Sequence, residues 1–119
     1  MPKKFYTAAG PAEAPEISAD YEKAKEFDKL RVGDLGVYFR DGFRVKYIPY
    51  EYLDRAFIRI QQAHGTKTVG AVTYDYFRMV FVHAGEEFAS CLSEKEKAMD
   101  QALAEIAAHG VATGFIRAE

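Results

Sequence analysis

The stretch Leu35–Ile60, which reads LGVYFRDGFRVKYIPYEYLDRAFIRI, decides the fold. Apolar residues alternate with polar ones on both sides of Asp41-Gly42, which is typical of two antiparallel strands joined by a tight turn. The Ile48-Pro49-Tyr50 break should end the second strand, because proline has no backbone N–H to donate to a sheet. Arg55–Gln61 then reads as a third strand with one apolar face.

The segment Ser93–Ala108 predicts an amphipathic helix near the end of the chain. Ser93 and Glu96 match a capping box, and Gly110 is a suitable stop. Four apolar residues recur at helical spacing and form one stripe: Met99, Ala102, Leu103 and Ile106. Strands followed by one closing helix predict an α+β, mainly β fold. We expect antiparallel strands in a small barrel or in two packed sheets, capped by this helix.

The register of the first hairpin follows from which face can be buried. A two-residue Asp41-Gly42 loop would place Phe39 opposite Arg44 and mix cations into the apolar face. A three-residue loop, Arg40-Asp41-Gly42, pairs Phe39 with Phe43 and leaves one face wholly apolar. We therefore predict the three-residue loop, with Gly42 supplying the positive φ. The opposite face would then carry three side chains: Tyr38, Arg44 and Lys46.

The segment after the third strand predicts further strands separated by turns. His64–Lys67 is predicted as a turn, and strands are expected at Thr68–Tyr74 and Phe77–His83 because both are rich in β-branched and aromatic residues. Ala84-Gly85 should close a last hairpin onto Glu86–Cys91. The tail leaves two alternatives open, since Val111–Ile116 is apolar enough either to form a short strand or to pack as coil.

The N-terminal segment Met1–Ser18 is rich in Ala, Pro and Glu, and its prolines, including Pro15, disfavour a helix. We expect it to be a flexible or loosely docked leader, followed by a single domain over residues 19–119. Asp20–Asp28 fits either a short helix or the approach to a first strand. The sequence does not choose between these two.

Composition narrows the classes of function. With 119 residues the chain suits one domain, and its net charge of −2 gives no broad attraction to nucleic acid or anionic lipid. Cys91 is the only cysteine, so no internal disulfide can form, and a reducing cytoplasmic setting is expected. No apolar run is long enough for a signal peptide or a membrane span.

The run Tyr47-Ile48-Pro49-Tyr50, the acidic link Glu51-Tyr52-Leu53-Asp54 and the C-terminal helix together resemble the pleckstrin-homology-like fold, in particular its small bacterial versions. The resemblance implies a single such domain that serves as a scaffold for protein or peptide contacts or for self-assembly. Lipid-binding members of this superfold use a longer first loop with several Lys and Arg. Here the loop Arg40-Asp41-Gly42 is short and contains an acid, so the resemblance implies no phosphoinositide or membrane binding.

Candidate catalytic and metal-binding residues are few. Cys91 with His83 or His64 could form a nucleophile and base, but no sequence context supports the pairing, and a small core residue is the favoured interpretation. The histidines and the cysteine lack metal-ligand spacing. We therefore expect no enzymatic activity, no metal and no cofactor.

The candidate binding surface combines cations and tyrosines. Arg44 and Lys46, with Arg59 and Tyr38 nearby, could dock an acidic or phosphorylated partner, although the solvated outer face of a sheet is the favoured interpretation. Two tyrosines near the proline, Tyr50 and Tyr52, could belong to an interface or could simply cover the end of the barrel, and the sequence favours neither. The sequence thus predicts a non-enzymatic protein- or peptide-binding module that does not bind nucleic acid, and it leaves a homodimer open. The alternative is a small-ligand-binding or catalytic protein with a pocket at the barrel mouth.

Overall fold

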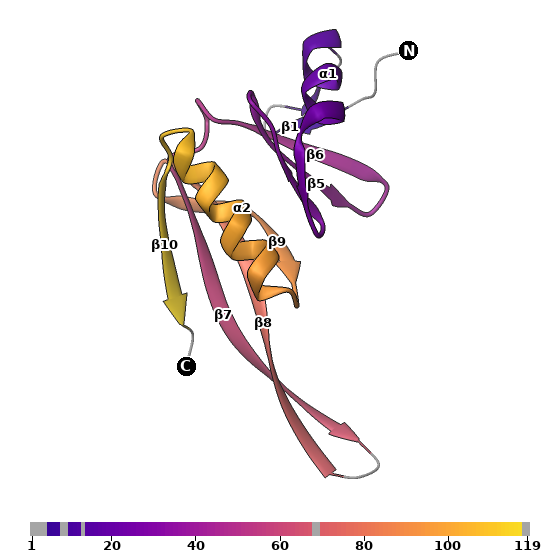
Figure 1. Ribbon diagram of the computed structural model, residues 1–119, viewed down its shortest axis with the longest axis vertical. Coiled ribbons are helices and arrows are strands. Elements are labelled where there is room, and N and C mark those ends of the chain that lie inside the picture. The colour runs from indigo at the N-terminus through magenta and orange to yellow at the C-terminus, as the bar shows by residue number, and fades with distance from the viewer. Residues whose placement is uncertain (1–4, 8–9, 13, 68–69, 118–119) are drawn as a thin grey trace.

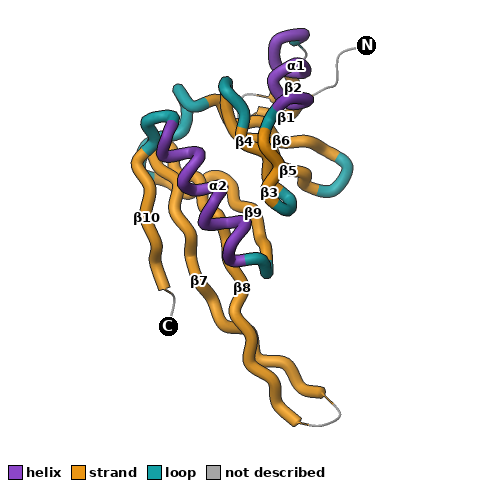
Figure 2. Tube along the Cα trace, in the orientation of Figure 1, coloured by secondary structure: helices purple, strands orange, loops and turns teal. Residues whose placement is uncertain are grey.

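A computed structural model describes residues 5–7, 10–12, 14–67 and 70–117 of the chain. The molecule is α+β and mainly β, as predicted (Figure 2). In chain order its elements are β1 (Phe5–Thr7), β2 (Gly10–Ala12), α1 (Pro15–Lys23), β3 (Lys25–Phe27), β4 (Leu30–Val32), β5 (Gly36–Asp41), β6 (Arg44–Pro49), β7 (Arg55–Lys67), β8 (Gly70–His83), β9 (Glu86–Ser93), α2 (Glu96–Ala108) and β10 (Ala112–Arg117).

The strands form two sheets. Sheet A has the strand order β2-β1-β6-β5-β4-β3, and sheet B has the order β10-β7-β8-β9. The two sheets pack against each other, and α2 lies across sheet B (Figure 1). Of the two architectures expected from the sequence, the described strands adopt two packed sheets and do not close into a barrel.

The first and last strands of the chain each join a sheet in parallel. β1 pairs in parallel with β6, and β10 pairs in parallel with β7, whereas the other described pairings are antiparallel. The tail that the sequence left open between strand and coil is therefore a strand. The other open segment, Asp20–Asp28, contains both alternatives, because α1 ends at Lys23 and β3 follows at Lys25.

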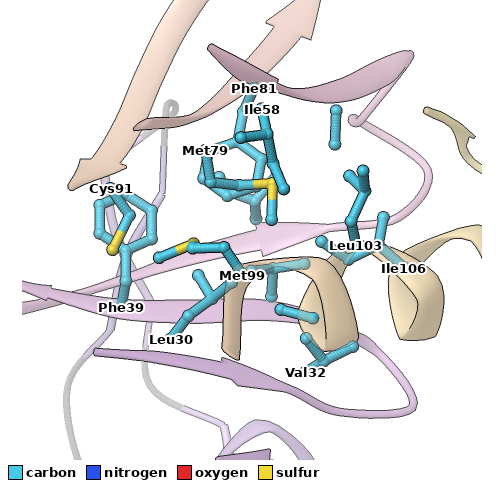
Figure 3. Close-up of a cluster of buried hydrophobic side chains, with 14 of the residues drawn as sticks. Leu30, Val32, Phe39, Ile58, Met79, Phe81, Cys91, Met99, Leu103 and Ile106 are labelled. Atoms are coloured by element: carbon cyan, nitrogen blue, oxygen red, sulfur yellow. The ribbon is translucent and has the colours of Figure 1, made fainter. Parts of the chain in front are cut away.

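The main core lies between the two sheets and α2 (Figure 3). The predicted helix stripe is confirmed, since its four residues are buried: Met99, Ala102, Leu103 and Ile106. The stripe meets Leu30 and Val32 of sheet A and Ile58 and Met79 of sheet B in one cluster. Each such side chain contributes on the order of 1.5–3 kcal/mol through burial. Because α2 contacts β3 and β4 as well as β7, β8 and β10, it covers one seam between the sheets.

A second, smaller cluster lies on the other face of sheet A. It consists of Phe5, Tyr38, Val45 and Tyr47, with Ile17 and Tyr21 of α1 packed against it. The predicted leader thus contributes Phe5, which is fully buried, and residues 1–4, 8–9 and 13 of that leader lie outside the described part. Pro15 does not prevent the helix because it occupies the first turn of α1, where a missing N–H costs nothing.

The carboxylate of Asp20 fastens α1 to sheet A. It is buried and accepts hydrogen bonds from the backbone N–H groups of Asp34 (2.8 Å) and Leu35 (3.0 Å) and from the hydroxyl of Tyr38 (2.6 Å). A Cβ atom at Gly33 would lie 2.3 Å from this carboxylate, so glycine is needed there. Burial, and then the carboxylate of Asp20, raise the pKa of Tyr38. Tyr38 is therefore an interior residue, which corrects its predicted place on an outer face.

The predicted register of the first hairpin is wrong. Asp41 pairs with Arg44, so the loop is the two residues Gly42 and Phe43, with Gly42 at φ +64° as type II′ turns require at this position. Phe43 is fully exposed instead of facing Phe39. The prediction assumed one buried face, but β5 is buried on both faces, so hydrophobic alternation does not select the register here.

The predicted turn at His64–Lys67 is also wrong, because β7 runs through it and pairs with β8 as far as Lys67 opposite Gly70. The two strands predicted at Thr68–Tyr74 and Phe77–His83 are one strand, β8, although Thr68 itself lies outside the described residues. The β7–β8 hairpin projects beyond the core (Figure 1), which gives the molecule its extents of 51 × 29 × 23 Å.

Helix α2 begins at Glu96, three residues later than predicted, and Ser93 is the last residue of β9. The hydroxyl of Ser93 donates to Asp28 Oδ2 at 2.6 Å and accepts from the N–H of Lys95 at 3.0 Å. Engagement with Asp28 explains why Ser93 forms no capping box. Gly110, at φ +88°, follows the helix as predicted. Neither described helix combines the length and apolarity that crossing a bilayer requires.

Candidate functional site

The seam opposite α2 is bordered by β9, the outermost strand of sheet B. β9 pairs with β8 along one edge, and no described strand pairs with its other edge. An edge strand presents unpaired backbone N–H and C=O groups to whatever lies beside it. A bulge interrupts the pairing between Phe81 and Val82 and leaves Phe88 as the extra residue of β9. The regular part of the free edge is therefore residues 89–93.

A groove runs beside this free edge. It consists of two adjoining hollows of about 480 and 280 Å³, which share four lining residues: Phe39, Lys46, Phe88 and Ala89. The larger hollow extends along Ser90, Cys91 and Leu92 to Lys29 in the turn between β3 and β4. The smaller one continues to Tyr6 of β1 and Ile48 of β6. We call this continuous space the β9 groove.

The larger hollow of the β9 groove is strongly cationic. Four basic residues border it, from four different parts of the fold, against the single carboxylate of Asp41: Lys29, Arg40, Lys46 and Arg78. Lys46 shares the face of Phe39, whereas the strand register places Arg40 and Arg78 on the outer faces of their sheets, at the rim of the hollow. Among the side chains that the structure describes, none forms an ion pair with any of the four. By contrast, Arg59 on the outer face of sheet B is paired with Glu87 at 2.6 Å. The groove therefore holds positive charge that the described fold does not neutralise.

Arg78 is positioned by hydrogen bonds rather than by a carboxylate. Its Nη1 donates to Ser90 Oγ at 3.0 Å, and its Nε donates to Gln61 Oε1 at 3.4 Å. Arg78 pairs opposite Arg59 and so lies on the outer face of sheet B, where the contact with Ser90 holds its guanidinium next to the edge strand β9. A guanidinium fixed in this way keeps further N–H donors for a carboxylate or phosphate.

Cys91 lies in the wall of the groove but is not activated. Its side chain is buried next to Phe39 (Figure 3), and burial raises the pKa of its thiol to about 11. The thiol is therefore protonated at neutral pH and is a poor nucleophile. This agrees with the interpretation of Cys91 as a core residue.

His83 does not complete a catalytic pair with Cys91. His83 pairs with Glu86 and Cys91 pairs with Met79, which places the two about 13 Å apart along the strands. His83 Nδ1 donates to the carbonyl oxygen of Tyr52 at 2.8 Å. The side chain of His64 lies outside the described part. No cluster of metal ligands occurs among the residues that were described with side chains.

The predicted binding surface is largely dispersed. Tyr38 is buried, Tyr50 donates its hydroxyl to the Gly33 carbonyl at 2.6 Å, and Tyr52 stacks on His83 with 3.7 Å between ring centroids. Arg59 lies in the other sheet. These side chains serve internal contacts, which the number of tyrosines around the proline could not reveal.

Of the predicted residues, Lys46 is the one that lines the β9 groove. Arg44 is on the same face of β6, since alternate residues of a strand share a face, and its guanidinium stacks over the Tyr6 ring at 4.7 Å. The sequence analysis missed Lys29, Arg40 and Arg78. No spacing pattern connects them, because only the packing of the two sheets brings them together.

Comparison with protein families, with curated proteins and with solved structures gave no match. The geometry of the β9 groove is therefore the basis for a functional proposal.

Proposed function

We propose that this chain is a non-enzymatic binding module that holds an extended peptide along the free edge of β9. The observation that carries the proposal is the juxtaposition of that edge with the β9 groove. Addition of a strand to an exposed edge is a common mode of peptide recognition, in which main-chain hydrogen bonds supply affinity and flanking side chains supply specificity.

β9 suits this role better than the other sheet edges. The edge strands β2 and β3 of sheet A have three residues each, which offers few backbone hydrogen bonds. β10 has six residues and contains Gly114, which weakens a strand. β9 offers residues 89–93 next to a groove wide enough to hold side chains.

The likeness to the pleckstrin-homology-like fold stays a prediction. It is supported by the order of the elements, in which mainly antiparallel strands precede an amphipathic helix that covers one seam, although one further strand, β10, follows the helix. The cytoplasmic location also stays a prediction, supported by the single unpaired cysteine. Self-assembly would use the same edge, with a second copy in place of the peptide.

The alternative, a small-ligand or catalytic protein, has less support. Its expected nucleophile, Cys91, is buried and protonated. The hollows are open along an edge strand, whereas small-molecule sites are enclosed and mostly apolar.

Hydrogen exchange measured by NMR on the full chain tests the proposal. Peptides selected from a random heptapeptide phage library are synthesised and added to the protein. Strand addition should slow the exchange of alternate β9 amides between residues 89 and 93, because they gain hydrogen bonds. N-methylation of alternate peptide amides should abolish binding. Selected peptides that leave these amides unprotected, or a library that yields none, would contradict the proposal, and light scattering separates self-association from peptide binding.

A further inference from the structure

We infer that the peptide bound in the β9 groove is acidic, with carboxylates at more than one position; this rests on the proposed function. The chain as a whole has a net charge of −2, yet the larger hollow of the groove is lined by four cations and one carboxylate. The local sign is thus opposite to the global one. An acidic ligand would be attracted by the groove itself and not by the protein as a whole.

The state of these cations supports the inference. Lys29 and Arg40 are exposed, and Lys46 and Arg78 are half-buried. None of the four forms an ion pair with a carboxylate among the described residues, although ion pairs form elsewhere in the molecule, such as Arg59 with Glu87. An incoming carboxylate therefore meets donors that are free of competing ion pairs within the described residues. Charges that are partly screened from water interact more strongly than fully exposed ones.

The distribution of the cations favours several carboxylates over one phosphate. Lys29 comes from the turn between β3 and β4, Arg40 from β5, Lys46 from β6 and Arg78 from β8. A single phosphate is usually held by donors that converge on one point. Here the cations border the hollow from four elements and from both sheets, so we infer that they offer separate contacts to an extended peptide.

The test uses three labelled peptides, TEVEVET, TQVQVQT and TKVKVKT, with the full chain. Their backbones are equally able to extend, so only the charge differs. Fluorescence anisotropy should show the glutamate peptide binding at least about tenfold more tightly than the glutamine peptide, with an advantage that shrinks as salt rises from about 50 to 300 mM. The lysine peptide should bind weakest. Equal binding of the glutamate and glutamine peptides would overturn the inference.

Charge reversal assigns the effect to the groove. Arg40→Glu and Lys46→Glu should each weaken binding of the glutamate peptide about tenfold and improve that of the lysine peptide. Arg55→Glu is the matched control, because Arg55 is exposed on β7, two strands away from β9, and stacks on Phe57. If Arg55→Glu weakens binding as much as the groove variants do, the charge effect is not local and the inference fails.

The outcomes distinguish the inference from the proposed function. A glutamine peptide that binds as well as the glutamate peptide and protects the β9 amides would leave strand addition intact and remove the acidic preference. A glutamate peptide that binds equally well when N-methylated would keep the preference and remove strand addition. If a version with one central phosphoserine binds more tightly than the glutamate peptide, the ligand is a phosphorylated peptide and the inference of several carboxylates fails. Absence of binding by every peptide would overturn both.

Discussion

The two seams between the sheets flank the same core but involve different strands, and only one of them is covered by a helix. One seam is covered by α2, which buries Met99, Leu103 and Ile106 against both sheets. The other is left open beside β9 and is lined by cations with no described ion-pair partner. The closed seam holds the sheets together through apolar burial. We expect the open seam to contribute less to stability and, if the proposed function is right, to hold the peptide on the opposite side of the core from α2.

A charge placed in the closed seam should have the largest effect. We predict that Leu103→Asp lowers the free energy of unfolding by roughly 4 kcal/mol, because it removes an apolar contact and buries an unpaired carboxylate. Urea denaturation measures the change. Ala104→Asp, an exposed neighbour on the same helix, should change it far less. Similar losses in the free energy of unfolding for the two variants would mean that this face of α2 is not part of the core.

The junction of the two seams should show an intermediate effect. Ser93→Ala removes the 2.6 Å hydrogen bond that joins the end of β9 to Asp28. Since Ser93 is buried and Asp28 is half-buried, we expect a loss of roughly 2 kcal/mol. Thermal melts can compare it with Glu94→Ala, an exposed neighbour whose replacement should be nearly neutral. A neutral Ser93→Ala would mean that β9 is held without this contact.

Alkaline pH should lower the free energy of unfolding through Cys91, which belongs to the core and also borders the groove. Burial raises the pKa of the Cys91 thiol to about 11, above its unfolded value near 9, so folding favours the protonated form. This contribution is complete below about pH 9 and is lost as pH rises through 11. The resulting loss in the free energy of unfolding should be about 1 kcal/mol by pH 10. The free energies of unfolding of the parent chain and of Cys91→Ala, each measured at pH 8 and at pH 10, isolate this loss. An equal change between the two pH values in both proteins would contradict the prediction.

The smallest effect on stability is expected in the open seam. Arg40→Glu should change the free energy of unfolding by less than about 0.5 kcal/mol, because Arg40 is exposed and has no described ion-pair partner. The same variant is expected to weaken the binding of acidic peptides strongly. Chemical denaturation beside the binding assay would establish the contrast with Leu103→Asp. A large loss of stability would show that the open seam also supports the fold.

The sequence predicted those parts of the fold that depend on local patterns. The α2 stripe, the end of β6 at Pro49 and the hairpin at Ala84-Gly85 each follow from a few neighbouring residues, and each is confirmed. The register of β5 and β6 could not be obtained in this way. It depends on a second cluster, supplied by Phe5 and α1, that buries the face carrying Tyr38.

The candidate site was less predictable than the fold. Lys46 was expected at a binding surface, but Lys29, Arg40 and Arg78 lie far apart in the sequence and share no spacing. The tyrosines selected from composition are used in internal contacts, such as the hydrogen bond from Tyr50 to Gly33. Residue types indicate what chemistry is available. Which residues meet is decided by how the two sheets pack.

The parallel pairing of β1 with β6 has a consequence for how the chain is made. Phe5 pairs with Val45, so the two partners are synthesised forty residues apart. The hairpin of β5 and β6 can form as soon as it emerges from the ribosome, whereas β1 must wait for it and then close a long loop. Until then Phe5 has no partner strand to be buried against, so β1 can settle only after a strand that is made forty residues later.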